Sequence, residues 1–174
     1  MTLSPLVSVS TTVQTHEIGE KCVQAVQTIF PDFLGENVPA AECFPVQRNA
    51  VKICCDGLSP DHFLELLGEQ RILDTALDAM ALNLQDNSTS FLLSRQAALS
   101  GKVAFVLETE RTIGGVIEVS LISNDIVDWL QEATWHPGRH DVPRSIGDEL
   151  SMHPDGGVSE WFDKDGRATI QSDD

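Results

Sequence analysis

Basic and amide side chains gather in one stretch of the sequence, where they could bind phosphate. Six of the eleven Lys and Arg residues fall between positions 48 and 111. Arg95, Gln96 and Lys102 surround a predicted turn at Gly101, where backbone N–H groups can also face an anion. The candidate contact surface comprises six residues: Lys52, Gln70, Arg71, Arg95, Gln96 and Lys102.

Two of these candidates have an additional argument from helix electrostatics. We expect Gln70 and Arg71 to begin a long helix, and the start of a helix favours anions. The alternative interpretation is an ordinary surface ion pair for each cation, such as Arg71 with Asp74 at helical spacing. Arg95 and Lys102 could form similar pairs, so the sequence leaves both interpretations open.

Histidines near the C-terminal end offer a weaker candidate site. His136, His140 and Asp141 lie close together in sequence, and His153 follows. Two histidines and a carboxylate could bind zinc or another divalent ion. The spacing matches no established motif, and no Gly-x-Ser-x-Gly nucleophile elbow is present. We therefore assign no metal, no cofactor and no catalytic residue, and expect a protein that is not an enzyme.

Aromatic residues give little support for base stacking on a nucleic acid. The chain has no Tyr and seven Phe residues, and these Phe residues lie in apolar contexts. Phe105 alone lies on a predicted strand near the basic turn, and we expect it to pack in the core. Sequence-specific recognition of single strands, which uses exposed rings, is disfavoured.

The charge balance excludes one class of nucleic-acid-binding protein. The 174 residues contain 27 Asp and Glu against 11 Lys and Arg, which gives a formal net charge of -16. Binding by bulk positive charge requires a basic surface, so we predict no DNA partner. The acids are spread along the chain, and only four residues are Lys. This pattern is typical of proteins of salt-accumulating organisms, and we expect a halophilic archaeal source; an ordinary acidic protein is the alternative.

The location follows from apolar patterning and cysteine usage. No stretch approaches the ~18 apolar residues that a membrane span needs. We expect a soluble protein of the cytoplasm with no membrane partner. The four cysteines are Cys22, Cys43, Cys54 and Cys55. Because Cys54 and Cys55 are adjacent and no C-x-x-C pattern occurs, we expect free thiols in the core, in a reducing compartment.

The elements that must position these residues follow from hydrophobic periodicity. Strands are predicted at 6–13, 50–55, 89–94, 102–107 and 115–122. Helices are predicted from a cap at Thr15 to Ile29, over 60–67, over 69–84 with a break at Gly68, and over 125–134. Residues 31–49 are predicted to form a loop. The fold class is therefore α+β, with a mixed or mostly antiparallel sheet and helices on one face.

The chain divides into one α+β domain, 1–135, and an acidic C-terminal appendage, 136–174, which we expect to be partly ordered at best. The appendage is rich in turn signals and poor in apolar residues. Residues 158–162 and 167–170 could form one small hairpin in it.

Four segments carry a resemblance to a known family: Phe30-Pro31-Asp32, 68–76 (GEQRILDTA), 93–105 (LSRQAALSGKVAF) and 115–119 (GVIEV). With these segments in order from about residue 6 to 135, the chain resembles archaeal uncharacterised protein family 0201. The resemblance implies an α+β fold similar to that of the ribosomal protein that binds 5S rRNA. It also implies a predicted RNA-binding role, in association with an exosome-like assembly, and no catalytic residue.

The function expected from all of this is a non-enzymatic module that binds structured RNA or an RNA-processing (exosome-like) assembly. A protein–protein adaptor without direct RNA contact is the alternative, favoured by the negative charge and the missing aromatics. A small metal-dependent hydrolase that uses His136, His140 and Asp141 is the weaker alternative. The oligomeric state stays open.

Overall fold

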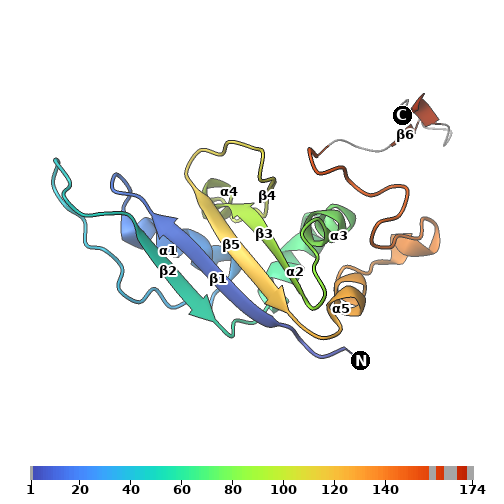
Figure 1. Ribbon diagram of the computed structural model, residues 1–174, viewed down its shortest axis with the longest axis horizontal. Helices are drawn as coiled ribbons and strands as arrows, with labels where there is room; N and C mark the ends of the chain where they lie inside the picture. The colour runs from blue at the N-terminus through green and yellow to red at the C-terminus, as the bar shows by residue number, and fades with distance from the viewer. Residues whose placement is uncertain (1, 157–159, 163–167, 172–174) are drawn as a thin grey trace.

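The computed structural model describes residues 2–156, 160–162 and 168–171 (Figure 1). Seven strands are β1 (Leu6–Val13), β2 (Val51–Asp56), β3 (Ser88–Ser94), β4 (Phe105–Val106), β5 (Val116–Ile122), β6 (Glu160–Phe162) and β7 (Ala168–Gln171). The helices of these described residues are α1 (Gly19–Ile29), α2 (Asp61–Glu69), α3 (Leu73–Ala81), α4 (Arg95–Leu99) and α5 (Ile126–Ala133), with a 3₁₀ helix at Pro137–His140. The predicted α+β class is confirmed.

The first five strands form one antiparallel sheet in the order β2-β1-β5-β3-β4. Alternation fixes which face each residue occupies, because successive strand side chains point to opposite sides. Val7, Val9 and Val13 of β1 are buried, whereas Ser8 and Ser10 between them point to the other face. The same alternation runs through β5 and β3, so the sheet has one apolar and one polar face.

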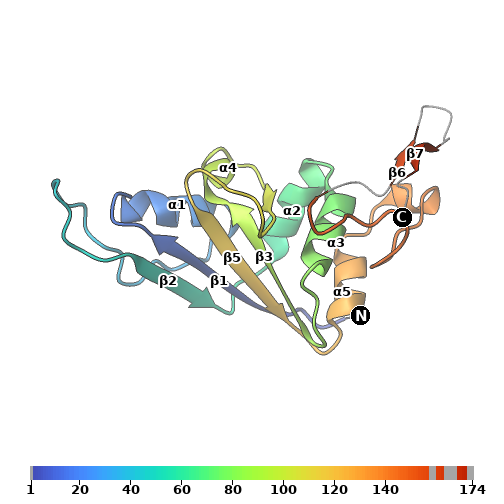
Figure 2. The ribbon, with the colours of Figure 1, turned by 45° about the horizontal axis from the view of Figure 1, so that its top comes forward.

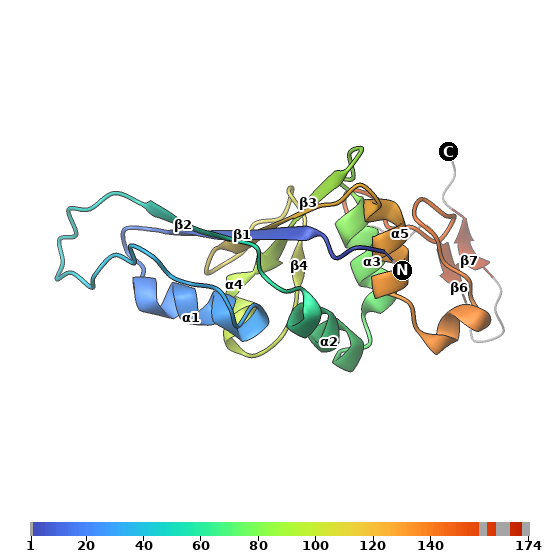
Figure 3. The ribbon, with the colours of Figure 1, turned by 90° about the horizontal axis from the view of Figure 1, so that it is seen from below.

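Helices cover only the apolar face. Seen along the sheet, α1, α2 and α4 all lie on one side of it (Figure 3). α3 and α5 pack against each other beside one end of the sheet (Figure 2). Phe30, Phe63, Phe91 and Phe105 form an aromatic cluster in the core, with neighbouring ring centroids 5.6–6.4 Å apart. The predicted core role of Phe105 is therefore confirmed, and the polar face is left without a helical cover.

The helix boundaries differ from the sequence prediction at two places. α1 begins at Gly19, because residues 14–17 form a turn closed by Gln14 N–H donating to the Glu17 carboxylate (2.8 Å). The predicted break at Gly68 is wrong: α2 continues to Glu69. The chain turns instead at Arg71, which adopts a left-handed conformation with φ 59°. Gln70 and Arg71 thus lie between two helices and do not begin one.

The region after β3 also differs from the prediction. α4 was not predicted; Ser94 caps it by accepting a hydrogen bond from Ala97 N–H (3.2 Å). The predicted strand at 102–107 is reduced to the two residues of β4. The remaining residues form the turn at Gly101 and contact the α2–α3 junction.

The C-terminal segment 136–156 packs on α3 through buried charges. Arg139 bonds Asp74 (3.1 Å), and Arg144 bonds both Asp78 (2.7 Å) and Asp148 (2.8 Å). The predicted hairpin is present as β6 and β7, whereas its turn at 163–167 lies outside the described residues. No helix among the described residues is long and apolar enough to cross a membrane.

Candidate binding surfaces

Arg95 lies inside the protein and cannot contact a ligand from the surface. Only 3% of the residue is exposed. Its guanidinium donates to the Gly114 carbonyl (2.8 Å), to the Thr11 hydroxyl (2.8 Å) and to the Thr12 carbonyl (2.8 Å), and it pairs with Glu17. All of its donor nitrogens therefore have partners, and we remove Arg95 from the predicted contact surface.

The Arg95 network joins β1, the β1–α1 turn and the start of β5. Burial alone would raise the pKa of Glu17, but hydrogen bonds from the Gln14 N–H and from Arg95 outweigh it and lower that pKa. Gly115 (φ 79°) leaves the space for the guanidinium: a Cβ there would lie 2.8 Å from the Arg95 Cζ. The Gly114-Gly115 pair thus makes room for the buried Arg95 side chain.

Three of the predicted residues come together at the α2–α3 junction. The Gln70 side chain donates to the Val103 carbonyl (3.0 Å) and accepts from the Val103 N–H (2.7 Å). Arg71 and Lys102 each adjoin one member of this pair in sequence, and both are exposed. The structure therefore brings three of the six predicted residues together, with Gln70 as the residue that joins the two chain segments.

Free cations are scarce elsewhere. Other cations form ion pairs, namely Lys52, Arg95, Arg139 and Arg144. Arg48 donates hydrogen bonds to the Gln14 and Glu17 carbonyls. Within the described ranges, the side chains that are exposed and have no hydrogen bond or ion pair include Arg71, Lys102 and Arg111. The expected Arg71–Asp74 pair does not form, because Asp74 bonds His136 and Arg139.

The two other predicted residues lie apart from this junction. Gln96 is exposed on α4, and its Cβ would lie 3.2 Å from a Cβ added at Gly114. Lys52 lies on the polar face of the sheet, bonded to Glu118 (2.6 Å). The hydrogen bond from Lys52 lowers the pKa of Glu118, and the same bond raises the pKa of Lys52.

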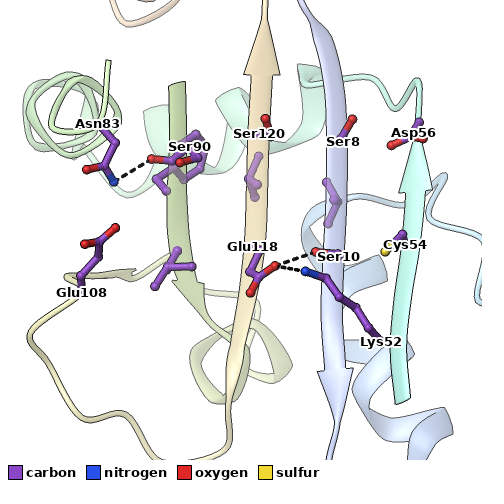
Figure 4. Close-up of a pocket in the computed structure, with 14 residues that line it drawn as sticks. Ser8, Ser10, Lys52, Cys54, Asp56, Asn83, Ser90, Glu108, Glu118 and Ser120 are labelled. Carbon is purple, nitrogen blue, oxygen red and sulfur yellow. Dashed lines mark hydrogen bonds and ion pairs between the residues drawn. The ribbon is translucent and has the colours of Figure 1, made fainter. Parts of the chain in front are cut away.

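The polar face carries a row of serines that the sequence analysis did not single out. Across the strands, Asp56 pairs with Ser8, Ser8 with Ser120, and Ser120 with Ser90 (Figure 4). In the part of the chain that the structure describes, these three hydroxyls have no hydrogen-bond partner. Small side chains leave a hollow of about 370 Å³ above them. The serines at alternate positions of β1, β3 and β5 could have predicted this polar row from the sequence.

The hollow is a poor phosphate site and a suitable site for hydroxyl or amide groups. Its border carries Asp56, Glu108 and Glu118 against the single cation Lys52, which Glu118 already binds. In the five-stranded sheet, the outward positions of the described strands carry no aromatic side chain. Free hydroxyls both donate and accept hydrogen bonds, so this surface can bind neutral polar groups.

The histidines do not converge on a metal site. His136 bonds Asp74 (3.0 Å), whereas the His140 ring packs edge-on against Trp135 at 5.5 Å. The described residues contain no group of three or more His, Cys, Asp or Glu side chains that could hold a metal ion. The cysteine prediction was wrong in part: Cys22 is buried, but Cys43 and Cys54 are exposed.

No protein-family model matches the chain. It is 33% identical over 127 residues to a UPF0201 protein of Methanothermobacter thermautotrophicus, covering 71% of this chain and 89% of that protein. It is 34% identical over 125 residues to a UPF0201 protein of Sulfurisphaera tokodaii, covering 70% and 83%. A crystal structure of a UPF0201 protein from Methanococcus jannaschii superimposes with a TM-score of 0.61 at 26% identity, covering 75% of this chain and 99% of that one. The chain therefore belongs to the archaeal UPF0201 family.

Proposed function

We propose that this protein is a non-enzymatic module that binds structured RNA, alone or within an exosome-like RNA-processing assembly. The observation that carries the proposal is the pair of free, exposed cations Arg71 and Lys102, one residue on either side of the Gln70–Val103 hydrogen bonds. In a chain of net charge -16, this junction is a place where phosphate meets unpaired positive charge.

The mode of binding follows from how few such cations there are. Phosphate contacts position a protein on its nucleic acid but carry no sequence information. With about two such contacts, affinity should fall with salt at a log–log slope of only about -1.4 to -1.8. Most of the affinity must then come from shape and from neutral contacts to ribose hydroxyls. A shallow salt dependence also suits a protein that works at high internal salt.

Cross-linking in cells at native internal salt tests this proposal. Ultraviolet light should attach RNA to peptides of the segment 68–105, and the Arg71→Glu/Lys102→Glu double variant should reduce the amount of attached RNA, because two carboxylates would then face the phosphates. Lys21→Glu is the matched control, because it reverses an exposed lysine on α1. Arg95→Glu is unsuitable, since it would break the buried network. Unchanged RNA recovery with a folded double variant would overturn the RNA contact.

A protein–protein adaptor is the second candidate, and the serine hollow favours it. The hollow is polar, acidic at its border and open, so it suits a neutral or basic protein segment better than phosphate. In that case Ser120→Arg, which fills the hollow, should remove a co-purifying protein. The Arg71→Glu/Lys102→Glu variant should then retain that protein, with no RNA above background in either sample.

The proposal places the protein in the cytoplasm of a salt-accumulating archaeon. The dispersed acids and the four lysines support the halophilic source. The likeness to the ribosomal protein that binds 5S rRNA stays a prediction. The metal-dependent hydrolase also stays a prediction, and the contacts of His136 with Asp74 and of His140 with Trp135 do not favour it.

A further inference from the structure

β2 is an edge strand with an open outer side. It pairs with β1, and no other strand of the described residues lies beyond it (Figure 1). Natural edge strands are usually protected by short length, charged side chains, prolines or bulges. β2 has no proline and no bulge, and its two exposed charges, Lys52 and Asp56, have opposite signs and can pair with a complementary strand. Its outer side is therefore able to accept another strand.

The backbone groups that face outward can be identified from the register. Gly57 N–H donates to the Val7 carbonyl (2.9 Å), which continues the ladder beyond Asp56. In an antiparallel ladder every second pair exchanges hydrogen bonds, so Cys55 and Ile53 face β1. Lys52, Cys54 and Asp56 consequently point their N–H and C=O groups away from the sheet. Among the described residues, these groups accept one weak hydrogen bond, from the Cys55 thiol to the Asp56 carbonyl (4.0 Å).

We propose that β2 pairs with β2 of a second copy of this chain, antiparallel and centred on Cys54. In that register Lys52 lies opposite Asp56 of the second copy, and the two-fold axis repeats the pair. All three side chains are exposed on the polar face. Asp56 has no ion pair within the described ranges, and the Lys52 ammonium has three N–H donors, so it can keep Glu118 and also bind Asp56 of the second copy.

Charge complementarity selects a second copy over another strand. The pattern Lys52-x-Cys54-x-Asp56 is complementary to itself when reversed, with opposite charges at its two ends. Opposite charges directly across two strands stabilise a sheet, and like charges destabilise it. A shift of two residues would pair Cys54 with a charged residue and lose one ion pair on each side.

The proposed pairing also determines how the two sheets lie in the dimer. Pairing about an axis perpendicular to the sheet would create a ten-stranded sheet from the two five-stranded ones. Both serine hollows would then open on the same side.

Oxidative cross-linking tests the register directly. The two Cys54 Cα atoms would be about 5.5 Å apart, which is within the range that a disulfide spans. Diamide should therefore accept two electrons and two protons from the paired thiols and leave a covalent dimer. Cys54→Ser should abolish this dimer, whereas Cys43→Ser, which removes the other exposed thiol, should retain it. A dimer that forms equally well without Cys54 would overturn the register.

Charge exchange tests the partner by sedimentation of the full chain in molar KCl. Asp56→Lys should weaken the dimer about tenfold, because two attractive pairs become repulsive. The Lys52→Asp/Asp56→Lys double variant should restore most of the affinity, and Glu69→Lys, an equal charge change on α2, should have no effect. A wild-type chain that stays monomeric would overturn the proposal. The RNA-contact variant Arg71→Glu/Lys102→Glu should dimerise normally, so the two proposals fail independently.

Discussion

Arg95 shows how a single basic residue can be structural in a protein with few cations. It bonds β1, the turn before α1 and the chain before β5 from an almost fully buried position. Removing one partner of a buried ion pair typically costs about 3–5 kcal/mol. We predict a loss of that order for Arg95→Met, measured by urea unfolding.

The control for Arg95 is the removal of both charges. Glu17→Gln/Arg95→Met leaves no uncompensated carboxylate, so it should recover at least half of the lost stability. A loss below about 1 kcal/mol for Arg95→Met alone would contradict the structural role that we assign to the network.

Arg71 combines an exposed charge with a strained backbone. Its φ of 59° lies in the left-handed region, which costs a residue with a Cβ roughly 1–2 kcal/mol. Arg71→Gly should therefore stabilise the fold by up to about 1 kcal/mol, after the greater flexibility of glycine in the unfolded chain is counted. The same variant should reduce RNA cross-linking. Thermal unfolding of Arg71→Gly beside Lys102→Gly checks this, and a less stable Arg71→Gly would refute it.

The stability that Asp148 contributes through its bond with Arg144 is lost at low pH. Burial would raise its pKa, but hydrogen bonds from Arg144 and the Ser145 N–H lower it from 3.8 to about 2. A lowered folded-state pKa stabilises the protein above the unfolded value and loses that effect as the pH falls toward 2. Asp148→Asn should flatten this acid loss in urea unfolding between pH about 5 and about 3. Asp78, whose pKa burial raises, acts in the opposite direction.

At the scale of elements, α3 depends on the segment that follows the domain. Asp78 and Arg144 expose only 8% and 7% of their side chains. A chain that ends at residue 135 loses the ion pairs of Asp74 and Asp78 with this segment and exposes the Asp78 carboxylate to water. We predict that this chain is less stable than the full chain by about 1–3 kcal/mol in urea unfolding.

Two further chains separate this effect from simple loss of length. A chain that ends at 156 keeps Arg139 and Arg144 and should unfold like the full protein. Asp78→Asn should recover stability in the chain that ends at 135, because it removes the unpaired charge. If the 135-residue chain is as stable as the full one, the ion pairs between α3 and segment 136–156 contribute nothing.

The strands and helices could be predicted where local pattern dominates. Alternating Val and Ser in β1 and alternating Ile, Val and Leu in β5 predicted both strands and the polar face. A break between α2 and α3 was predicted at Gly68, but its position at residues 70–72 could not be, because there Gln70 bonds Val103, a contact over 33 residues. α4 and the shortening of β4 follow from the same long-range packing.

The candidate surface could be predicted only in part, for a similar reason. The sequence analysis selected Gln70, Arg71 and Lys102 because they are basic or amide residues at a predicted helix start or turn. It could not show that Arg95 is buried, since the partners of Arg95 are as many as 84 residues away. Nor could it assign Asp74, whose partners His136 and Arg139 lie 62 and 65 residues along the chain.

At the scale of the whole molecule, the excess of acids is the feature with the widest consequence. Exposed acids are spread over α1, α2 and the loops, and their mutual repulsion disfavours the compact state. The Debye length is about 10 Å at 0.1 M salt and about 3 Å at 1 M, so molar salt screens this repulsion almost completely. High salt should therefore favour both the folded chain and its pairing through β2.

We predict that the protein is more stable to unfolding in molar KCl than in low salt. The matched variant replaces exposed acids that form no ion pair among the described residues, at Glu20, Asp32, Glu36 and Glu69, with Gln or Asn. It lowers the repulsion without changing the ion pairs of Arg95, Arg139 or Arg144, so its stability should depend less on salt. Equal stability of the wild-type chain in both salts would refute the halophilic interpretation. An unchanged salt response in the variant would assign the salt effect to burial of apolar surface, which KCl can also strengthen.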